Sequence, residues 1–396
     1  MRQKVDVLVS GGGVAGLAAA AAFGSAGYSV ICVDPAPPVT TGDAPGADLR
    51  TTAFLQPSIP VLQAAGLWQR LEPQAMPLQV MRIVDAGGTE PVARLSHDFD
   101  AADVSGQPFG WNLPNWLLRR EFVARLAELP GVDFRPGVAT RRLFTREREA
   151  LVGLSDGTQV TARLVVAADG RHSPVRKALG IGVKTRRYGQ KALAFAVTHP
   201  EPHGNVSTEI HRSGGPFTLV PLPDHQGKPC SAVVWMETGP EIDRLRALPH
   251  EAFAEAMNAR SCGLFGWLEQ ASPLTVWPII TQQAERFCGQ RVALMAEAAH
   301  VVPPIGAQGL NMSLGDLAAL IDLATPETLG EPGPLEAYHR RRWPEVALRL
   351  AGVDALNRAS MIEAQPLRDA RAATLHALYS LAPVRKGLMQ LGIGLR

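Results

Sequence analysis

The chain has 396 residues, of which 46% are hydrophobic, 19% charged and 6% aromatic. This length corresponds to two or three domains of about 150 residues, and the composition excludes a disordered, collagen-like or disulfide-stapled chain. The formal net charge of +2 provides no global field for nucleic acid, so we expect no nucleic-acid partner.

Basic residues gather toward the C-terminal end. Residues 338–396 hold ten Lys or Arg and four Asp or Glu. This pattern is typical of a solvated helical tail, and it also fits a surface that meets anionic lipid or an acidic partner. No run of 18 strongly apolar residues predicts a transmembrane helix. The four cysteines are scattered, so we expect no metal site, and reduced thiols in a cytoplasmic protein.

The first 34 residues predict a strand, a glycine-rich turn, a helix and a second strand. The apolar run at 5–9 is a buried parallel strand, and the alanine-rich run at 17–23 is the helix. Residues 28–33 form the second strand. The whole has the length of one βαβ unit.

The turn of this unit has the sequence Gly11-Gly12-Gly13-Val14-Ala15-Gly16, which fits G-x-G-x-x-G. It lies between a strand and a helix, the context that a dinucleotide-binding turn needs. Gly11 allows the tight turn, Gly13 lets the backbone approach a diphosphate, and Gly16 lets the helix and strand pack closely. The N–H groups at the helix start favour an anion. We therefore predict that Gly11, Gly13, Val14, Ala15 and Gly16 bind a cofactor.

Asp34 ends the second strand, 18 residues after Gly16. A carboxylate at this place accepts hydrogen bonds from the adenosine ribose hydroxyls and repels a 2′-phosphate. Asp34 is therefore a predicted cofactor ligand, and the bound dinucleotide should be FAD or NAD, not NADP.

The later elements alternate between helical and strand patterns. We predict a helix over 49–71, β-structure over 73–112, a helix over 117–129, and a hairpin over 151–166 whose turn is Asp156-Gly157. Residues 183–285 predict a mostly antiparallel sheet with one helix near 249–258. A buried strand at 291–295 and a helix after Pro304 follow. The tail is helical, with breaks expected at Pro344, Pro366 and Pro383.

Two further segments identify the dinucleotide. Residues 165–176 contain Asp169-Gly170, and residues 296–311 run from Ala296-Glu297 to Asn311. Both resemble the signature segments of the aromatic-hydroxylase flavoproteins, and Asp48-Leu49-Arg50-Thr51-Thr52-Ala53 is typical of the ubiquinone-biosynthesis hydroxylases among them. The resemblance implies that the cofactor is FAD.

The same resemblance implies an α/β fold: a discontinuous Rossmann-like FAD/NAD(P)-binding domain, an antiparallel substrate sheet and a C-terminal helical segment. We assign residues 1–182 and 286–335 to the FAD-binding domain, 183–285 to the substrate domain and 336–396 to the helical segment. Within the substrate sheet, we predict Phe217 and Trp235 as walls of the pocket.

The resemblance also implies roles for single residues. Pro304 should lie at the boundary between flavin and substrate, and Gly306 and Gly309 leave bare backbone before a helix N-terminus, which suits the negative edge of a reduced flavin. The remaining predicted FAD contacts are Arg50 near the flavin or its pyrophosphate, Arg120 near the ribityl chain, Asp169 and Gly170 close to the FAD, and Leu310 and Asn311 beside the isoalloxazine.

One position departs from the family pattern. The family usually has Gly-Asp where this chain has Ala296-Glu297. The aspartate normally holds a ribityl hydroxyl, and Glu297 adds one methylene to that side chain. Loss of one hydrogen bond to a charged group costs roughly 1.5–3 kcal/mol. The ribityl end is therefore where we expect FAD binding to be weakest.

The chemistry implied by the resemblance is the flavin's own. A flavin C4a-hydroperoxide, formed with O₂, attacks an electron-rich ring, and the protein supplies a dry pocket and orientation. We therefore predict no catalytic acid, base or nucleophile. With a single nucleotide turn in the sequence, NAD(P)H bound transiently or a partner protein is the electron donor.

The implied substrate is a polyprenylated phenol on the path to ubiquinone. Such a substrate is membrane-dissolved, so peripheral contact with the inner membrane or membership of a quinone-biosynthesis complex is expected. Two alternatives stay open at this point. The chain could hydroxylate or epoxidise another aromatic or secondary metabolite, or it could be a non-catalytic subunit that binds FAD weakly. The sequence predicts no oligomeric state.

Overall fold

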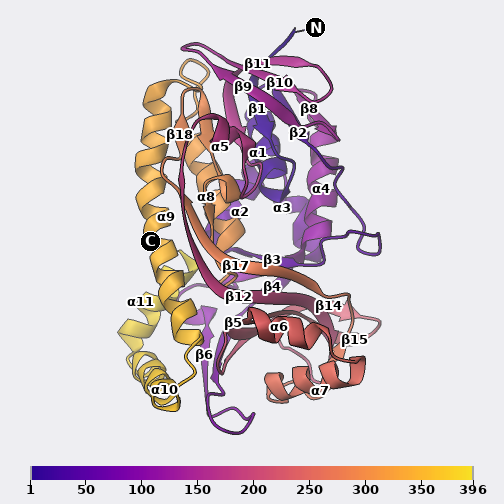
Figure 1. Cartoon of the computed structure of the whole chain (residues 1–396), viewed down its shortest axis with the longest axis vertical. Coiled ribbons are helices and arrows are strands. Elements are labelled where there is room, and N and C mark those ends of the chain that lie inside the picture. Colours follow the sequence, from indigo (N-terminus) through magenta and orange to yellow (C-terminus); the bar gives the residue numbers. More distant parts are fainter. Residues whose placement is uncertain (1, 395–396) are drawn as a thin grey trace.

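Two β-sheets stacked along the long axis form the frame of the protein (Figure 1). The computed structural model describes residues 2–394. The first sheet and its helices occupy one end of the molecule, and the second sheet crosses the chain below them. A long helix, α9 (Pro332–Ser360), runs along one side of both.

The first sheet has eight strands in the order β18-β19-β11-β1-β2-β8, with β10 and β9 added beside β11. Its central strands run parallel, and β19 pairs with β11 from far along the chain. The sheet therefore takes strands from two separate regions of the sequence. Its strands are β1 Arg2–Ser10, β2 Val30–Asp34, β8 Val132–Pro136, β9 Thr140–Thr145, β10 Ala150–Leu154, β11 Gln159–Ala167, β18 Cys288–Gly289 and β19 Val292–Leu294.

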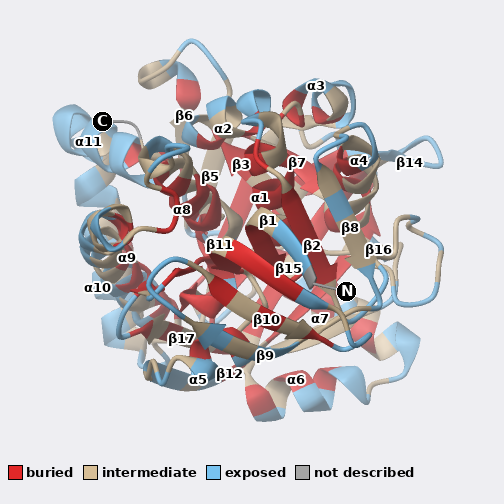
Figure 2. Cartoon of the chain, turned by 90° about the horizontal axis from the view of Figure 1, so that it is seen from above, coloured by how far each residue is buried: buried red, intermediate tan, exposed pale blue. Residues whose placement is uncertain are grey.

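Helices cover this sheet closely. The alanine-rich α1 (Val14–Ser25) is buried from Gly16 to Phe23 because it lies between the sheet and two further helices, α4 (Asn115–Ala127) and α8 (Gln308–Leu323). Small side chains let these layers approach one another. Figure 2 shows the result: β11 and the second half of β1 are largely buried, whereas exposed residues are common on the outer helices.

The second sheet has nine strands in the order β20-β17-β12-β15-β14-β13-β5-β6, with β16 beside β12. All its pairs are antiparallel except β13 with β5. Its strands are β5 Val80–Asp85, β6 Leu95–Asp100, β12 Val183–Thr198, β13 Val206–His211, β14 Pro216–His225, β15 Lys228–Thr238, β16 Glu269–Gln270, β17 Thr275–Ala284 and β20 His300–Val301.

Residues 80–100 belong to this second sheet as β5 and β6, although the sequence interpretation places them in the first segment of the FAD-binding domain. The reason is the parallel pairing of β5 with β13, in which Val80 lies opposite Val206. No local pattern in the sequence predicts a pairing over that separation.

One face of the second sheet packs on α6 (Gly239–Arg246) and α7 (His250–Ser261). Phe217 and Trp235 lie in this layer, with ring centroids 5.4 Å apart. The prediction that they line the substrate pocket is therefore wrong. Successive side chains of a strand alternate between faces, and it is Val234 whose side chain turns toward the FAD-binding side.

A small third sheet, β3-β7-β4, lies between the two large ones. Its strands are β3 Thr51–Leu55, β4 Met76–Leu78 and β7 Gly110–Pro114. The helix predicted over 49–71 is wrong in its initial residues, because β3 pairs antiparallel with β7 and only the short helices α2 (Ile59–Ala64) and α3 (Trp68–Leu71) follow.

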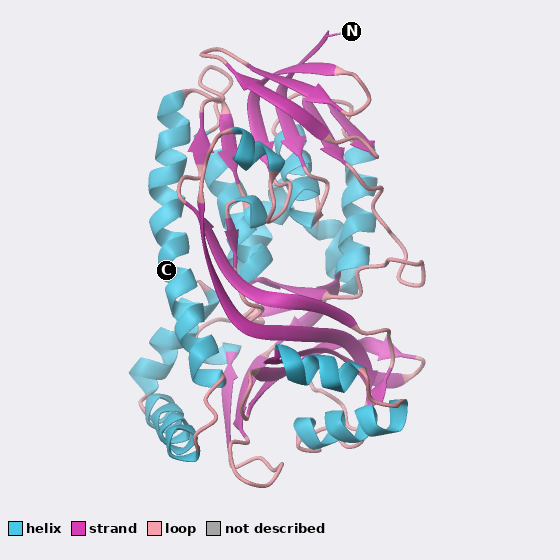
Figure 3. Cartoon of the chain, in the orientation of Figure 1, coloured by secondary structure: helices cyan, strands magenta, loops and turns pink. Residues whose placement is uncertain are grey.

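Helices end the chain, as Figure 3 shows along one side of the molecule. α10 spans Gln365–Ser380 and α11 spans Ala382–Ile393, and each has its proline in the first turn, where proline is tolerated. The break predicted at Pro344 is wrong, because α9 continues through it. Trp343 Nε1 donates to the Ala284 carbonyl at 3.0 Å, and this tertiary contact helps to hold the helix there. The last two residues of the predicted segment 336–396 lie outside the described residues.

No helix among residues 2–394 has the length and apolar character needed to cross a membrane.

Asp85 at the end of β5 joins the second sheet to the C-terminal helices. The residue is 1% exposed, and it accepts hydrogen bonds from Arg94 Nη2 at 2.6 Å and from Arg371 Nη2, on α10, at 2.9 Å. Burial disfavours the ionised carboxylate, but the bonds from Arg371 and Arg94 outweigh burial and keep the pKa of Asp85 below its usual value.

We expect Asp85→Asn to lower the free energy of unfolding by roughly 3 kcal/mol, because Arg371 loses its counter-charge and Arg94 retains only the exposed Asp369. Urea unfolding at pH 7 measures this. The folded-state pKa is depressed, so the wild-type advantage exists at neutral pH and is lost as the pH falls through that pKa. A variant as stable as wild type at pH 7 would contradict the assignment.

Candidate cofactor site

The glycine-rich turn has the geometry that its tasks require. Gly11 has a φ of +108°, and a Cβ there would lie 2.3 Å from the Ala168 carbonyl oxygen. A Cβ on Gly16 would lie 1.8 Å from the Gly11 carbonyl oxygen, whereas one on Gly13 would meet nothing within 4 Å. Gly11 and Gly16 are therefore fixed by packing. The open space at Gly13 fits a diphosphate in front of the start of α1, where Val14 and Ala15 begin the helix.

Asp34 lies beside this turn. Its Oδ2 accepts from Gly12 N at 2.6 Å and its Oδ1 from Ala36 N at 2.9 Å. These two bonds hold the carboxylate at the edge of the sheet where β1 and β2 end. Each oxygen retains a lone pair, so the orientation is compatible with acceptance of the ribose hydroxyls.

Asp169 follows β11 at the same edge. Its Oδ2 accepts from Val175 N at 3.1 Å, while its Oδ1 is buried without a hydrogen-bond partner. Burial raises the pKa of Asp169. A buried carboxylate oxygen without a donor is costly, and a cofactor that bears hydroxyl groups supplies such a donor. Gly170 turns the chain here with a φ of +83°, and a Cβ on it would meet nothing within 4 Å.

Arg50 lies where the FAD-binding side meets the second sheet. Its Nε and Nη2 each donate to Asp48 at 2.7 Å, and its guanidinium lies 5.5 Å from the centre of the Trp277 ring. Arg119 Nη2 also approaches Asp48, at 3.4 Å. The sequence interpretation missed Asp48 and Arg119. Asp48 could have been predicted as the ion-pair partner of Arg50, because it lies only two residues before it in the sequence.

Arg120 takes a different position. Its Nε donates to Glu121 at 2.9 Å and its Nη2 to Gln74 at 3.2 Å, and it lies over the Trp116 ring. These contacts do not join it to the glycine turn, to Asp169 or to the segment after Pro303. On α4, the neighbouring Arg119 is the arginine that reaches the Arg50 cluster.

The Ala296-Glu297 departure from the family pattern has a structural counterpart. Ala296 has a φ of +53°, a left-handed conformation that costs a non-glycine residue roughly 1–2 kcal/mol. The Glu297 side chain is half exposed, and its carboxylate lies 3.5 Å from Arg171 Nε. The pKa of Arg50 is raised mainly by its hydrogen bond to Asp48, and the negative charge of Glu297 adds to this. Glu297 thus pairs with Arg171 and lies within electrostatic range of Arg50.

The segment before α8 provides the second half of the site. Gly306 and Ala307 both have positive φ, +63° and +55°, and a Cβ on Gly309 would meet only Val302, at 3.9 Å. This leaves bare backbone near the start of α8, after Pro304. The Leu310 side chain packs on the hydrophobic core around the first sheet.

The Asn311 side chain anchors this segment to the chain around β3. It accepts from Leu55 N at 2.9 Å and from Ser58 Oγ at 2.7 Å, and it donates to the carbonyls of Ala53 and Ala307 at 2.7 and 2.6 Å. The amide is thus fully used within the protein. Any contact of Asn311 with a flavin would therefore come from its backbone.

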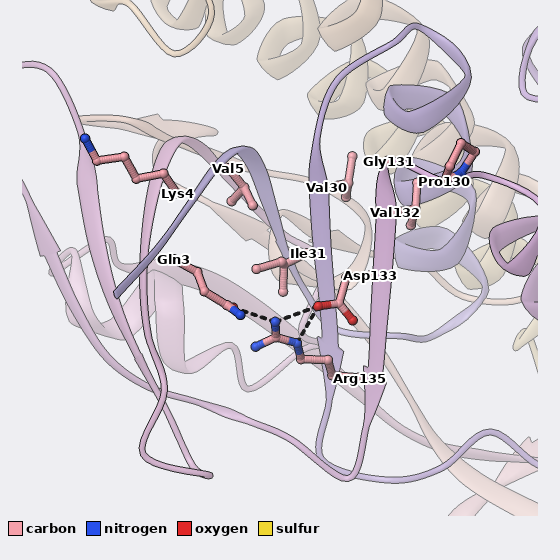
Figure 4. Close-up of a pocket in the computed structure, with 10 residues that line it drawn as sticks. All are labelled: Gln3, Lys4, Val5, Val30, Ile31, Pro130, Gly131, Val132, Asp133 and Arg135. Atoms are coloured by element: carbon pink, nitrogen blue, oxygen red, sulfur yellow. Dashed lines mark hydrogen bonds and ion pairs between the residues drawn. The ribbon is translucent and has the colours of Figure 1, made fainter. Parts of the chain in front are cut away.

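A shallow pocket at the other edge of the first sheet does not belong to this site (Figure 4). It lies among the early residues of β1, β2 and β8, where Arg135 bonds to Gln3 and Asp133. Ligands of open α/β sheets bind beyond the carboxyl ends of the strands, which is where Gly11, Asp34 and Asp169 meet.

The sequence matches the FAD binding domain family over residues 4–351. The chain belongs to this FAD-binding family. It is 34% identical to the ubiquinone hydroxylase UbiL of Rhodospirillum rubrum, covering 98% of this chain and 89% of that protein. It is 25% identical to the 3-demethoxyubiquinol 3-hydroxylase of Escherichia coli, covering 99% of each.

The fold also matches solved structures. The p-nitrophenol 4-monooxygenase PnpA of Pseudomonas putida superposes with a TM-score of 0.77 at 18% identity, over 99% of this chain and 98% of that one. The predicted fold class and the predicted membership of the FAD-dependent monooxygenases are thereby confirmed, and the protein is an enzyme of that group.

The two glycines of the turn should respond differently to substitution. Gly13→Ala should change stability by less than about 1 kcal/mol, because its Cβ meets no protein atom, yet it should abolish tight FAD binding by filling the diphosphate space. Gly16→Ala should destabilise the fold itself. Thermal unfolding and titration of the apoprotein with FAD distinguish the two, and equal effects of both variants on stability would refute this division.

Proposed function

We propose that this enzyme hydroxylates the aromatic ring of a polyprenylated phenol in ubiquinone biosynthesis, with FAD and O₂. The observation that carries the proposal is an apolar wall on the second sheet. The wall lies next to residues 303–309, which would face the flavin and are called the flavin segment below. The wall has the apolar character that a long hydrocarbon tail requires, and two of the similar proteins described above are named as ubiquinone or demethoxyubiquinol hydroxylases.

The wall begins beside the flavin segment. Ala192, Met236 and Ile279 on the sheet cluster with Ile305, which follows Pro304, and Trp277 packs against them. Arg50 lies over Trp277, so the wall begins where the FAD-binding side ends. An aromatic ring at this junction would lie between the flavin segment and the sheet.

The same face continues away from the flavin segment. Along β12, Ala192 pairs with Met236, Ala194 with Val234 and Ala196 with Ala232. At about 3.3 Å per residue, the run from 192 to 198 extends roughly 20 Å. None of the clustered residues on it carries a charge, and burial of hydrocarbon there is favourable at about 0.8 kcal/mol per CH₂. The cluster farther along the face consists of Leu222, Cys230 and Ala232, with Ala196 and Val220 packed on it.

The roles of the protein residues follow from this arrangement. When bound, FAD supplies the activation of O₂. The glycine turn and Asp34 would hold the adenosine half, and Asp169, Glu297 and the start of α8 the rest. The apolar wall excludes water and holds the substrate ring in place. The electrons come from NADH, NADPH or a partner protein, and flavin bleaching on anaerobic addition of each nucleotide distinguishes these sources.

A deletion strain tests the proposed reaction. Loss of the gene should remove ubiquinone and accumulate a prenylated intermediate that lacks one hydroxyl group, as mass analysis would show. Wild type should restore the quinone and Gly13→Ala should not. An unchanged quinone pool would favour another metabolite as substrate, and rescue by Gly13→Ala equal to wild type would favour a non-catalytic subunit.

We also propose that α11 brings the enzyme to a membrane surface. One face of this helix carries Val384, Leu388 and Leu391 at helical spacing, and Leu388 and Leu391 are 44% and 68% exposed. The opposite face holds Met389 and Ile393, which are buried. In Figures 1 and 2, α11 lies at the outer edge of the molecule.

The surroundings of this face favour a bilayer with anionic lipid. The C-terminal segment is basic, with ten Lys or Arg against four Asp or Glu from residue 338 onward, and such segments are attracted to anionic headgroups. The end of α11 also contacts the flavin segment, since Gln308 Nε2 donates to the Gly392 carbonyl at 3.4 Å. A lipid-dissolved substrate would therefore meet the enzyme close to its site.

The double variant Leu388→Ser/Leu391→Ser should bind less to vesicles that contain anionic phospholipid, with co-sedimentation reduced by about tenfold. The reason is that two leucine side chains no longer enter the apolar region of the bilayer. Trp267→Ser is the matched control, since Trp267 is also exposed (54%) but lies near β16. Equal binding by all three proteins would show that α11 is not the contact.

A further inference from the structure

Two alanines adopt left-handed backbone conformations beside the FAD site. Ala296 has a φ of +53° and Ala307 a φ of +55°. Each is held by a side chain of α8. Asn311 Nδ2 donates to the Ala307 carbonyl at 2.6 Å, and Asp316 Oδ2 accepts from Ala296 N at 3.2 Å. The Ala307 bond is local, four residues apart, whereas the Ala296 bond is tertiary and acts where a glycine would otherwise relieve the conformation.

Asp316 is the better buried of these two anchors. The carboxylate is fully enclosed, with a side-chain exposure of 0%. Besides Ala296 N, it bonds to His300 Nε2 at 2.6 Å through Oδ2 and accepts from Arg342 Nε at 2.9 Å through Oδ1. Burial disfavours its ionised form, but the charges of His300 and Arg342 outweigh burial and lower the pKa of Asp316.

The three partners of Asp316 come from two segments of the chain. Ala296 and His300 bracket the turn that carries Glu297, which contains the 3-10 helix η4 (Ala296–Ala298). Arg342 belongs to α9. Asp316 itself lies on α8, whose first residues form the flavin side of the site. One carboxylate thus connects the two chain segments that would hold the ribityl chain and the isoalloxazine.

We propose that Asp316 is a positioning residue for FAD: it holds Ala296 in the left-handed conformation and so fixes the Glu297 turn relative to the start of α8. The proposal rests on the FAD site described above. It explains how the chain tolerates alanine at 296, a position where L side chains are disfavoured. Asp316 acts through the backbone of Ala296 and makes no contact with the cofactor itself.

A purely structural role would predict something else. In that case Asp316 would matter only because it pairs with His300 and Arg342, and any buried carboxylate–arginine site should behave alike. Asp85 provides the comparison, since it is also buried and also bonds to arginine, in its case Arg94 and Arg371. It lies at the second sheet and α10, outside the cofactor site.

The test compares Asp316→Asn, Asp85→Asn, Ala296→Gly and the double variant Asp316→Asn/Ala296→Gly. Each apoprotein is titrated with FAD by quenching of flavin fluorescence, at a temperature where circular dichroism shows that it is folded. Thermal unfolding of the apoproteins is measured in parallel. Wild type that binds no FAD would refute the FAD site, and this outcome is distinct from failure of the positioning role.

We expect both Asn variants to lower the unfolding temperature, and only Asp316→Asn to raise the FAD dissociation constant, by about tenfold or more, equivalent to the 1.4 kcal/mol of one lost positioning bond. Glycine at 296 removes the need for that bond. The double variant should therefore regain most of the FAD affinity without regaining the unfolding temperature, a non-additivity that marks direct coupling.

Two outcomes would overturn the proposal. One is an FAD dissociation constant for Asp316→Asn that matches that of Asp85→Asn. The other is an Ala296→Gly substitution that fails to rescue the double variant. Should Asp316→Asn not fold, Ala296→Gly alone decides. Ala296→Gly should bind FAD at least as tightly as wild type and have an equal or higher unfolding temperature. Weaker binding would show that Ala296 is not held in a left-handed conformation that it disfavours.

Discussion

The close crossing of β1, β11 and α1 is the constraint on which the rest of the structure depends. Ala168 N donates to the Ser10 carbonyl and Gly11 N to the Val33 carbonyl, each at 2.8 Å. Because any Cβ on Gly11 would overlap the Ala168 carbonyl, the helix can follow the strand only through glycine. This crossing brings the carboxyl ends of three parallel strands to one edge, and with them the turn, Asp34 and Asp169.

The other half of the site depends on α8, which has no such glycine framework. Instead, side chains of α8 form hydrogen bonds with other elements. Asn311 bonds to the backbone of β3 at Ala53 and Leu55, and Asp316 bonds to the Glu297 turn and to α9. The adenosine end of the site is therefore specified by local sequence, whereas the flavin end is specified by contacts between elements far apart in the chain.

This difference explains what could be predicted from sequence. The βαβ unit, the Asp156-Gly157 hairpin and α4 follow from local patterns and appear as expected. The prediction for residues 51–55 was wrong because β3 exists only through its pairing with β7. For the same reason, the orientation of Trp235 depends on the register of β15, which its own apolar pattern does not define. Arg119 was missed because its partner, Asp48, lies on a distant loop.

The predicted cofactor site lies between the sheets, so the residues that would hold FAD also contact the apolar wall. Arg50 bonds to Asp48 on the FAD-binding side and lies over Trp277 on the apolar wall, so the same guanidinium touches both functions. Ile305 belongs to the wall and to the flavin segment alike. A shift of the start of α8 would therefore alter the pocket as well as the cofactor site. Since Asn311 bonds to β3 and Asp316 bonds to the Glu297 turn, these two side chains fix the start of α8 relative to the wall.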